Sequence, residues 1–336
     1  MVLGGSGTPD LKGYLVERAS SSAGPWSVIT ASPVLGATTT AAVTVADGNL
    51  VNGSVYWYRA RAQNTSNLYS SYCVAISDVP GANSTRTSNN IVYFEDMLGP
   101  GTNDWDYNDF VVRVAATEVV SGGDLSAITI DYEPLARGAS YIHMFRQHLP
   151  VQGNWTATLT RFVAGNPTQV ASRTTTAGTG PVDVEIWADT RSALAPATGS
   201  FTNTQPSQVG YQAGALARLE VTLTTPGANP DGALGAAPWD VYLRLPYLSG
   251  PQGNEIHRSL YGGSSEVVTS GPLVGTTLDF VLIHPLTTTA PSWSYEGVPV
   301  WHNYPAFIPF QQTASPADAD WADRPTSRTD VFDANH

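Results

Sequence analysis

Short stretches in which apolar and polar residues alternate recur along this chain of 336 residues and constrain its fold more than any other feature. In GSVYWYRARAQN, residues 53–64, Tyr56 and Tyr58 are expected on one face of an extended strand and Trp57 on the other. No amphipathic helical run exceeds about three turns, and Gly, Pro, Ser and Thr are plentiful between the alternating stretches. The sequence therefore predicts an all-β protein.

The pattern divides the chain into two β domains. Residues 1–80 contain GYLVER, GSVYWYRARAQN and SSYCVAI, which resemble the second half of a fibronectin type III domain. A polar linker is expected over 81–90, a larger antiparallel β-sandwich or jelly-roll-like domain over 91–310, and a polar C-terminal tail over 311–336. Only twelve residues precede GYLVER, so the first module is either shortened or completed by another segment. An open β-edge predicts self-association with further copies of the chain.

The charge balance excludes some partners. The net charge is −12, the pI is near 4.7, and no arginine-rich run is present, so we expect no nucleic-acid partner. The sequence contains no stretch of eighteen apolar residues, so we expect no transmembrane segment. An acidic, weakly charged surface suits a protein that meets divalent cations outside the cell. We therefore expect an extracellular or cell-surface location, a virion surface included.

Acidic residues gather in FEDMLGPGTNDWDYNDFVVRV, residues 94–114, although only 13% of the chain is charged. The candidate metal ligands there are Asp104, Asp106, Asn108 and Asp109, with Glu95 and Asp96 completing or orienting the shell. Calcium prefers six to eight oxygen ligands, which such residues supply. The interleaved Trp105 and Tyr107 can turn their rings into packing while the carboxylates converge. The alternative is a solvated hairpin loop in which Asp and Asn only stabilise turns.

The order of the acids differs from that of an EF-hand. Asp109 stands where the loop glycine belongs, and Ala115 takes the twelfth position in place of glutamate. We instead predict a turn at the end of a sheet, with Tyr93 and Phe94 on one strand and DFVVRV on the next. The apolar strands then fix the site to the core.

Four motifs in the same order resemble the LruC domain and related calcium-site domains of bacterial adhesins. They are FEDML followed by DWDYNDFVV, then ARGASYIHMFRQHLP, PWDVYLRLPYLSGPQGNEIH, and NYPAFIPF followed by DADW, within residues 91–323. The chain departs from that pattern at His143, Met144, Arg146, His148 and Phe310. The resemblance implies a secreted or surface-exposed β-rich domain with bound calcium, and for many proteins with such domains no enzymatic activity is known.

Other candidate sites are weaker. Glu255 and His257 could touch a cation, or they could form a hydrogen-bonded turn. Trp293, Trp301 and Trp321, in the loop-rich C-terminal part, could stack on sugars if exposed, or they could pack in the interior. No zincin spacing, nucleophile elbow or phosphate-binding loop is present, so we expect no catalytic residues.

These observations predict a non-catalytic, extracellular, calcium-binding structural or adhesive surface protein, such as a fibre, an appendage subunit or an exposed virion component. A calcium-dependent carbohydrate-binding module that recognises glycans or a host cell surface is the alternative. A hydrolase is the weaker rival.

Overall fold

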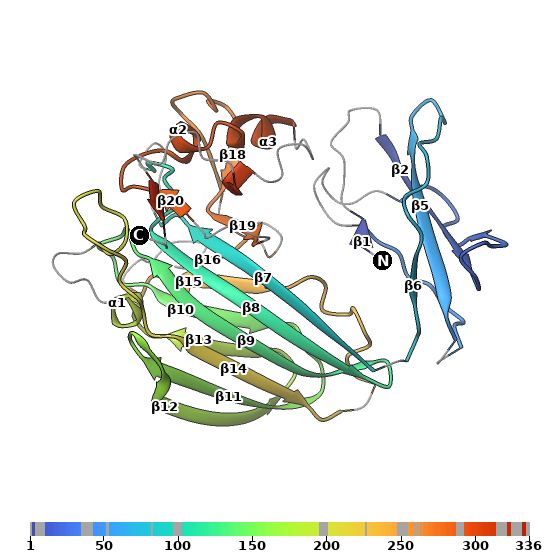
Figure 1. The fold of residues 1–336 in the computed structure, drawn as a ribbon, viewed down its shortest axis with the longest axis horizontal. Helices are drawn as coiled ribbons and strands as arrows, with labels where there is room; N and C mark the ends of the chain where they lie inside the picture. The colour runs from blue at the N-terminus through green and yellow to red at the C-terminus, as the bar shows by residue number, and fades with distance from the viewer. Residues whose placement is uncertain are drawn as a thin grey trace. The chain divides into compact units, whose positions relative to one another are not determined.

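The computed structural model confirms the all-β prediction (Figure 1). It describes residues 2–3, 11–34, 43–51, 54–81, 83–96, 103–194, 201–225, 227–246, 255–258, 261, 263, 265–286, 292–313, 321–323 and 331–333. These residues form two compact units. The first contains residues 1–83, 121–123 and 309–319, and the second contains 84–120, 124–308 and 320–336.

The first unit contains a four-stranded antiparallel sheet in the order β3-β2-β5-β6. Its strands are β2 (Leu11–Ala19), β3 (Ser27–Val28), β5 (Tyr56–Asn64) and β6 (Ile76–Asp78), and a separate pair joins β1 (Val2–Leu3) to β4 (Val43–Thr44). As the alternation predicts, Arg59 and Arg61 share a face of β5: their guanidinium carbons lie 3.8 and 4.8 Å from the ring centre of Tyr72. Such cation–π contacts stabilise an exposed sheet face modestly.

The segment predicted as a linker, residues 81–90, is mostly strand. β7 begins at Ser84 and continues to Phe94, and it pairs with β8 (Phe110–Ser121) from Ser84↔Val120 to Phe94↔Phe110. The Ser- and Thr-rich sequence of residues 84–89 reads as a loop by composition. It forms a strand because its backbone groups pair with the regular, apolar-rich β8.

The second unit is built on a seven-stranded sheet in the order β12-β11-β14-β9-β8-β7-β19 (Figure 1). The remaining strands are β9 (Asp124–Ala136), β11 (Asn154–Val163), β12 (Asn166–Thr179), β14 (Ala217–Leu223) and β19 (Val281–Pro285). The pairings β12–β11, β11–β14, β14–β9, β8–β7 and β7–β19 are antiparallel, which lets one face remain solvated while the other packs.

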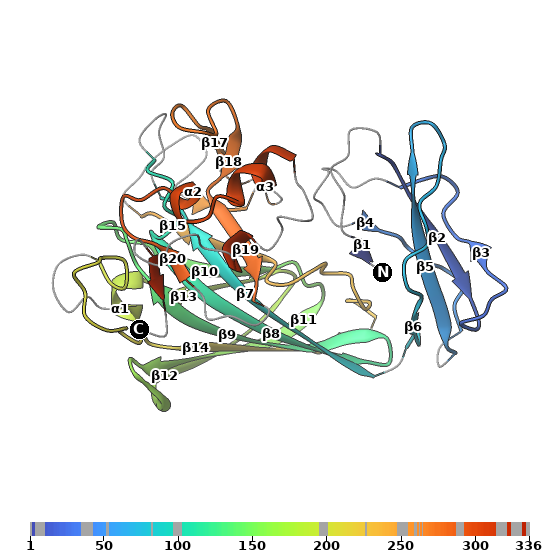
Figure 2. The same cartoon turned by 45° about the horizontal axis from the view of Figure 1, so that its top comes forward.

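A four-stranded sheet in the order β13-β10-β15-β16 lies along one face of the larger sheet (Figures 1 and 2). Its strands are β10 (Met144–Leu149), β13 (Val182–Trp187), β15 (Asp240–Arg244) and β16 (Glu255–Ile256). Aromatic rings join the two sheets: Phe145 on β10 lies 6.1 Å from Phe94 and 5.5 Å from Phe110, centre to centre. The second unit is therefore a β-sandwich with an aromatic core.

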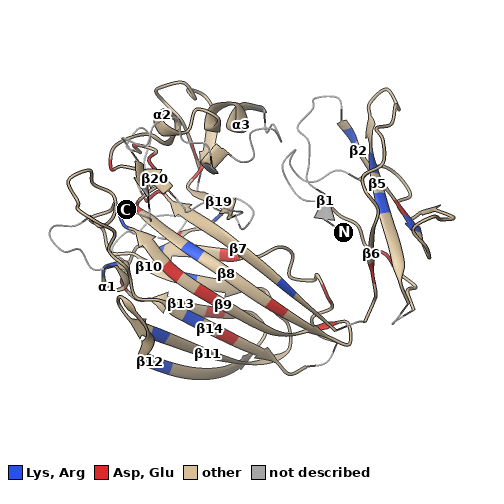
Figure 3. Cartoon of the chain, in the orientation of Figure 1, with Lys and Arg blue, Asp and Glu red and all other residues tan. Residues whose placement is uncertain are grey.

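On the outer face of the seven-stranded sheet, positively and negatively charged residues are interspersed (Figure 3). Arg113 lies 2.7 Å from Glu133, and Arg218 lies 2.6 Å from Asp131, in each case between neighbouring strands. Partly exposed pairs of this kind contribute about 0–1 kcal/mol each. These charged pairs keep the outer face solvated. The core of the sandwich, on the other face of the sheet, supplies most of the stability.

The C-terminal part combines short elements and lies near the ends of β7 and β8 (Figure 2). They are β17 (Ser265–Val267), β18 (Thr277–Asp279), β20 (Ser292–Ser294), β21 (Val331–Asp333), α2 (Val300–Asn303), α3 (Phe307–Thr313) and a 3-10 helix (Trp321–Asp323); α1 (Thr190–Ala193) follows β13. The predicted polar tail is partly packed, because Trp321, Val331 and Phe332 are buried and β21 pairs with β20.

Candidate metal centre

The acidic turn joins β7 to β8 at the end of the seven-stranded sheet, as the sequence predicts. Trp105 and Tyr107 have φ values of 59° and 55°, a left-handed conformation that is uncommon for bulky residues. Both rings are buried: Trp105 packs against Phe280, and Tyr107 packs against Phe307. Packing therefore holds the strained backbone, and the intervening carboxylates face the other way.

Three carboxylates converge on one point. One oxygen from each of Glu95, Asp104 and Asp106 lies within 4.8 Å of the other two. Glu95 is fully buried, Asp106 is 2% exposed, and Asp104 is partly exposed. Among the described residues, no other group of three His, Cys, Asp or Glu side chains meets this distance. The arrangement gives a cation access from the side of Asp104.

Backbone groups fix these carboxylates in place. The N–H of Tyr107 donates to Glu95 Oε1 at 2.7 Å, and the N–H of Gly297 donates to Asp106 Oδ2 at 2.7 Å. Each of these bonds engages one oxygen of its carboxylate. The other oxygen of Asp106, Oδ1, accepts from the N–H of Asn108 at 3.1 Å. The site is therefore preorganised by main-chain donors rather than by flexible side chains.

Three buried oxygens of the cluster and of the residues beside it lack a hydrogen-bond donor. Glu95 Oε2, Asn108 Oδ1 and Glu296 Oε2 accept no hydrogen bond from any described residue. The amide nitrogen of Asn108 donates to Ser294 O at 3.0 Å, which leaves the amide oxygen directed inward. Buried acceptors without a donor are costly, by about 1–3 kcal/mol each. Oxygen atoms are the ligands that calcium takes, so the donor set fits this ion.

Gly138 provides the space for this convergence. A Cβ atom at Gly138 would lie 1.6 Å from Asn108 Oδ1 and 2.5 Å from Glu296 Oε2, so both oxygens face the same side of its backbone. The N–H of Gly138 donates to Asn108 O at 2.8 Å. A side chain at residue 138 would therefore occupy the position where the two oxygens meet.

Asp96 and Asp109 are next to the cluster but make other contacts. The N–H of Asp96 donates to Asp109 Oδ2 at 2.7 Å, and Asp96 Oδ2 lies 2.7 Å from His143 Nε2. His143, Asp96 and Asp109 are buried. The sequence grouped Asp109 with the principal ligands, and in the structure its Oδ2 accepts a hydrogen bond from the backbone at the end of β7.

The electrostatics of the cluster disfavour full ionisation. Burial, then repulsion from Asp106 and Asp104, raises the pKa of Glu95 well above its usual range. Burial, then repulsion from Asp104 and Glu296, also raises the pKa of Asp106 well above its usual range. Burial also raises the pKa of Glu296 to about 8, helped by Asp104 and Asp96. A divalent cation would remove this repulsion.

These shifts predict how the stability of the chelated protein depends on pH. Because the folded-state pKa values of Glu95, Asp106 and Glu296 lie above their unfolded values, the folded state binds more protons, and stability falls as the pH rises. For Glu296 the window runs from its usual 4.5 to about 8. In EDTA, the melting temperature should therefore be higher at pH 5.5 than at pH 8.5. A melting temperature in EDTA that rises over this range would contradict the described electrostatics.

Glu296 is the site residue that sequence reasoning missed. It lies between β20 and α2, and its N–H donates to Thr204 O at 2.9 Å. In sequence it is an isolated acid in SWSYEGVPV, far from residues 95–109. Only the return of the chain to the end of β7 and β8 brings it to the cluster.

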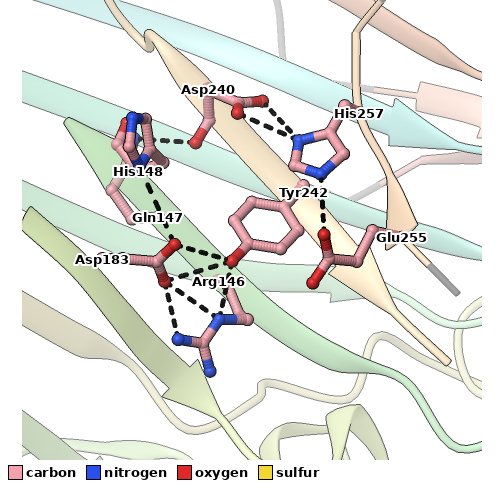
Figure 4. A network of polar contacts seen from close by, with 8 residues as sticks. All are labelled: Arg146, Gln147, His148, Asp183, Asp240, Tyr242, Glu255 and His257. Atoms are coloured by element: carbon pink, nitrogen blue, oxygen red, sulfur yellow. Dashed lines mark hydrogen bonds and ion pairs between the residues drawn. The ribbon is translucent and has the colours of Figure 1, made fainter. Parts of the chain in front are cut away.

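The predicted pair Glu255 and His257 belongs to a separate polar network on the four-stranded sheet (Figure 4). His257 Nδ1 lies 3.0 Å from Asp240 Oδ2, and Nε2 lies 3.3 Å from Glu255 Oε2. Burial lowers the pKa of His257, but the hydrogen bonds to Asp240 and Glu255 outweigh this and raise it. Both ring nitrogens of His257 are within hydrogen-bond distance of a carboxylate, so the pair is hydrogen-bonded, which was the alternative to a cation contact.

The rest of this network is also satisfied internally. Tyr242 stacks on His257 with ring centres 4.3 Å apart, and its hydroxyl donates to Asp183 Oδ2 at 2.9 Å. Arg146 Nη2 lies 2.6 Å from Asp183 Oδ1 (Figure 4). Arg146, Asp183 and Tyr242 lie on β10, β13 and β15, so the network ties the strands of the smaller sheet to one another.

The three tryptophans proposed for sugar stacking are buried. Trp293, Trp301 and Trp321 are 1, 7 and 5% exposed, so none of them presents a ring face to solvent. Trp293 stacks on Phe332 and donates to Asn203 O at 2.6 Å, and Trp321 packs against Phe307. The stacking prediction is wrong for these residues because the C-terminal elements fold over them, and the packing alternative is correct.

Residues 123–280 match the family model DUF4842. Its description is a domain of unknown function. The match covers the strands from β9 to β18 but not the acidic turn at residues 95–109. The LruC likeness stays a prediction. No curated protein matches the sequence.

Among solved structures, the chain is similar to a "Putative lipoprotein from Bacteroides ovatus". The TM-score is 0.52 at 12% identity, over 94% of this chain and 98% of that chain. This likeness concerns the fold alone. An α-L-rhamnosidase from Dictyoglumus thermophilum also aligns, at 12% identity over 64% of this chain and 21% of that chain, but its TM-score of 0.17 is too low to support any inference. No helix among the described residues is long and apolar enough to cross a membrane.

Proposed function

We propose that the chain is a non-catalytic surface protein whose β-sandwich is stabilised by a structural calcium ion. Glu95, Asp104, Asp106 and Asn108 would hold the ion at the end of β7 and β8. The observation that carries the proposal is the convergence of three carboxylates within 4.8 Å beside buried oxygens that lack donors. Calcium would supply the positive charge that such a cluster needs.

The residues around the site support a structural rather than a catalytic role. The carboxylates are held by main-chain donors, and the rings of Trp105 and Tyr107 close the site from the core side. A catalytic calcium or an acid–base pair would need room for a substrate, but Glu95 is fully buried and Asp106 nearly so. The ion would thus stabilise the folded state over the unfolded chain.

A surface location is part of the proposal. It is supported by the acidic composition and by the fold shared with the Bacteroides ovatus protein, whose description names a lipoprotein. In the first unit, the edge strand of the four-stranded sheet would provide a surface for attachment or adhesion. Val74 and Ile76, at and next to β6, are 86 and 52% exposed. Exposed apolar residues at a strand edge favour strand addition by another copy.

Thermal unfolding tests the calcium site. At a hundredfold excess over Kd, calcium should add about 2.7 kcal/mol to the free energy of unfolding. This corresponds to a rise in melting temperature of about 5–10 °C for a domain of this size. Magnesium, which prefers a smaller octahedral site, should give much less.

The matched variant carries Asp104→Asn and Asp106→Asn. It should lose most of the response to calcium while keeping its fold in EDTA, because neutral amides remove the repulsion as well as the ligand charge. Asp131→Asn, on the outer face of β9, serves as the control. A double variant that binds calcium as tightly as the unmodified chain would overturn the proposal.

A further inference from the structure

Glu296 comes to the acidic cluster from a part of the chain about two hundred residues away. It follows β20, and one of its oxygens is buried without a hydrogen-bond donor. That oxygen and Asn108 Oδ1 approach the same side of Gly138. Asn108 is fully buried, and its amide nitrogen is engaged by Ser294 O. Two buried acceptors with no donor between them would be stabilised by a positively charged group.

The loop that carries Glu296 is joined to the acidic turn by main-chain hydrogen bonds. Gly297 N donates to Asp106 Oδ2 at 2.7 Å, and Val300 N donates to Trp105 O at 2.8 Å. These bonds bring Glu296 toward Asp104 and Asp106, which repel it when all three are ionised. The hydrogen bonds and the charge repulsion therefore oppose each other, and a cation between the carboxylates would relieve the repulsion.

We propose that Glu296 is a further ligand of the cation, and that the ion thereby cross-links the acidic turn, residues 104–109, to the segment 292–308. This inference rests on the proposed calcium site. It adds a function to that site: the ion acts as a latch that holds the segment 292–308 over the end of β7 and β8. Without the ion, the segment is held only by its hydrogen bonds and by aromatic packing such as that of Phe307 on Tyr107.

Replacing Glu296 by glutamine separates the two roles that the side chain could have. Glutamine keeps the shape of the side chain and can donate a hydrogen bond to Asn108 Oδ1. If Glu296 only fills space or forms hydrogen bonds, the substitution should therefore preserve or increase stability. A cation ligand would lose its charge. Glu220→Gln, on the exposed face of β14, is the control.

Calcium titration by calorimetry on the full chain gives the first readout. We expect Glu296→Gln to weaken calcium binding at least tenfold and Glu220→Gln to leave it unchanged. In EDTA, the Glu296→Gln variant should melt at a temperature equal to or above that of the unmodified chain, because one repelling charge is gone. Weaker calcium binding together with unchanged or higher stability in EDTA cannot arise from misfolding.

Limited proteolysis with chymotrypsin gives the second readout. Trp293, Trp301 and Tyr304 are buried cleavage sites within the segment 292–308, and Tyr69, 49% exposed in the first unit, is an internal control. Cleavage in the segment should be slow in calcium and fast in EDTA, while cleavage at Tyr69 stays constant. Glu296→Gln should need at least tenfold more calcium for the same protection.

The outcomes distinguish this inference from the proposed function. If the unmodified chain binds calcium and Glu296→Gln binds it within twofold, Glu296 is not a ligand and the latch is overturned, while the calcium site stands. Cleavage of the segment 292–308 that is equally slow in EDTA would also overturn the latch. If the unmodified chain does not bind calcium, both proposals fail.

Discussion

Replacing Gly138 by alanine is expected to abolish tight calcium binding and to destabilise the β-sandwich. The added methyl group would lie 1.6 Å from Asn108 Oδ1 and 2.5 Å from Glu296 Oε2, so Asn108 would have to move. Asn108 is held by its hydrogen bond to Ser294 O. Overpacking of this kind costs about 1–3 kcal/mol, and the loss of bound calcium adds about 2.7 kcal/mol at a hundredfold excess over Kd.

The effect of Gly138→Ala should therefore depend on calcium. In calcium, the free energy of unfolding should fall by about 4–6 kcal/mol, and in EDTA only the overpacking part should remain. Denaturant unfolding in both buffers measures the difference. Gly48→Ala is the matched control, because nothing lies within 4 Å of a Cβ at Gly48. Equal losses of stability in the two buffers would show that Gly138 is not part of the cation site.

Replacing Phe145 by alanine should cause a comparably large loss of stability that does not depend on calcium. Phe145 is fully buried on β10, and its ring centre lies 5.5 Å from that of Trp187 and 5.7 Å from that of Tyr132. Removing a buried phenylalanine leaves a cavity and costs about 3–5 kcal/mol. Because this ring joins the two sheets, the cavity would lie in the centre of the sandwich.

Urea unfolding of Phe145→Ala should show a lower midpoint with an unchanged slope. Phe145→Leu, which keeps most of the volume, should lose less stability. Phe162→Ala, at the half-buried end of β11, should also lose less. The calcium affinity of the folded Phe145→Ala protein should match that of the unmodified chain. A loss below 1 kcal/mol would mean that the aromatic contacts between the sheets do not carry the core.

Local patterns predicted the parts of the fold that depend on neighbouring residues in sequence. The alternation in β5 and the apolar run of β8 identify strands, and the interleaving of Trp105 and Tyr107 with the acids predicts that rings and carboxylates separate. Composition was a poorer guide where pairing decides the structure. Residues 84–90 are rich in Ser, Thr and Asn, yet they form a strand because β8 supplies a partner for their backbone.

The sequence also could not predict which aromatic residues lie at the surface. Trp293, Trp301 and Trp321 stand among loop-forming residues, which suggested exposure, but short elements far apart in sequence cover them. The pair Glu255 and His257 met as expected, but its third partner, Asp240, comes from β15. Burial and partner choice are properties of the packed molecule.

The all-β class and the position of the acidic turn can be predicted from local sequence, because both arise from the order of residues within one strand or turn. Which acids converge depends on how the folded chain packs. Packing places Glu296 beside the cluster, brings Asn108 and Glu296 to one side of Gly138, and directs Asp109 Oδ2 to the backbone of Asp96. A cation site needs oxygens from several directions, and such oxygens come from segments that are distant in sequence.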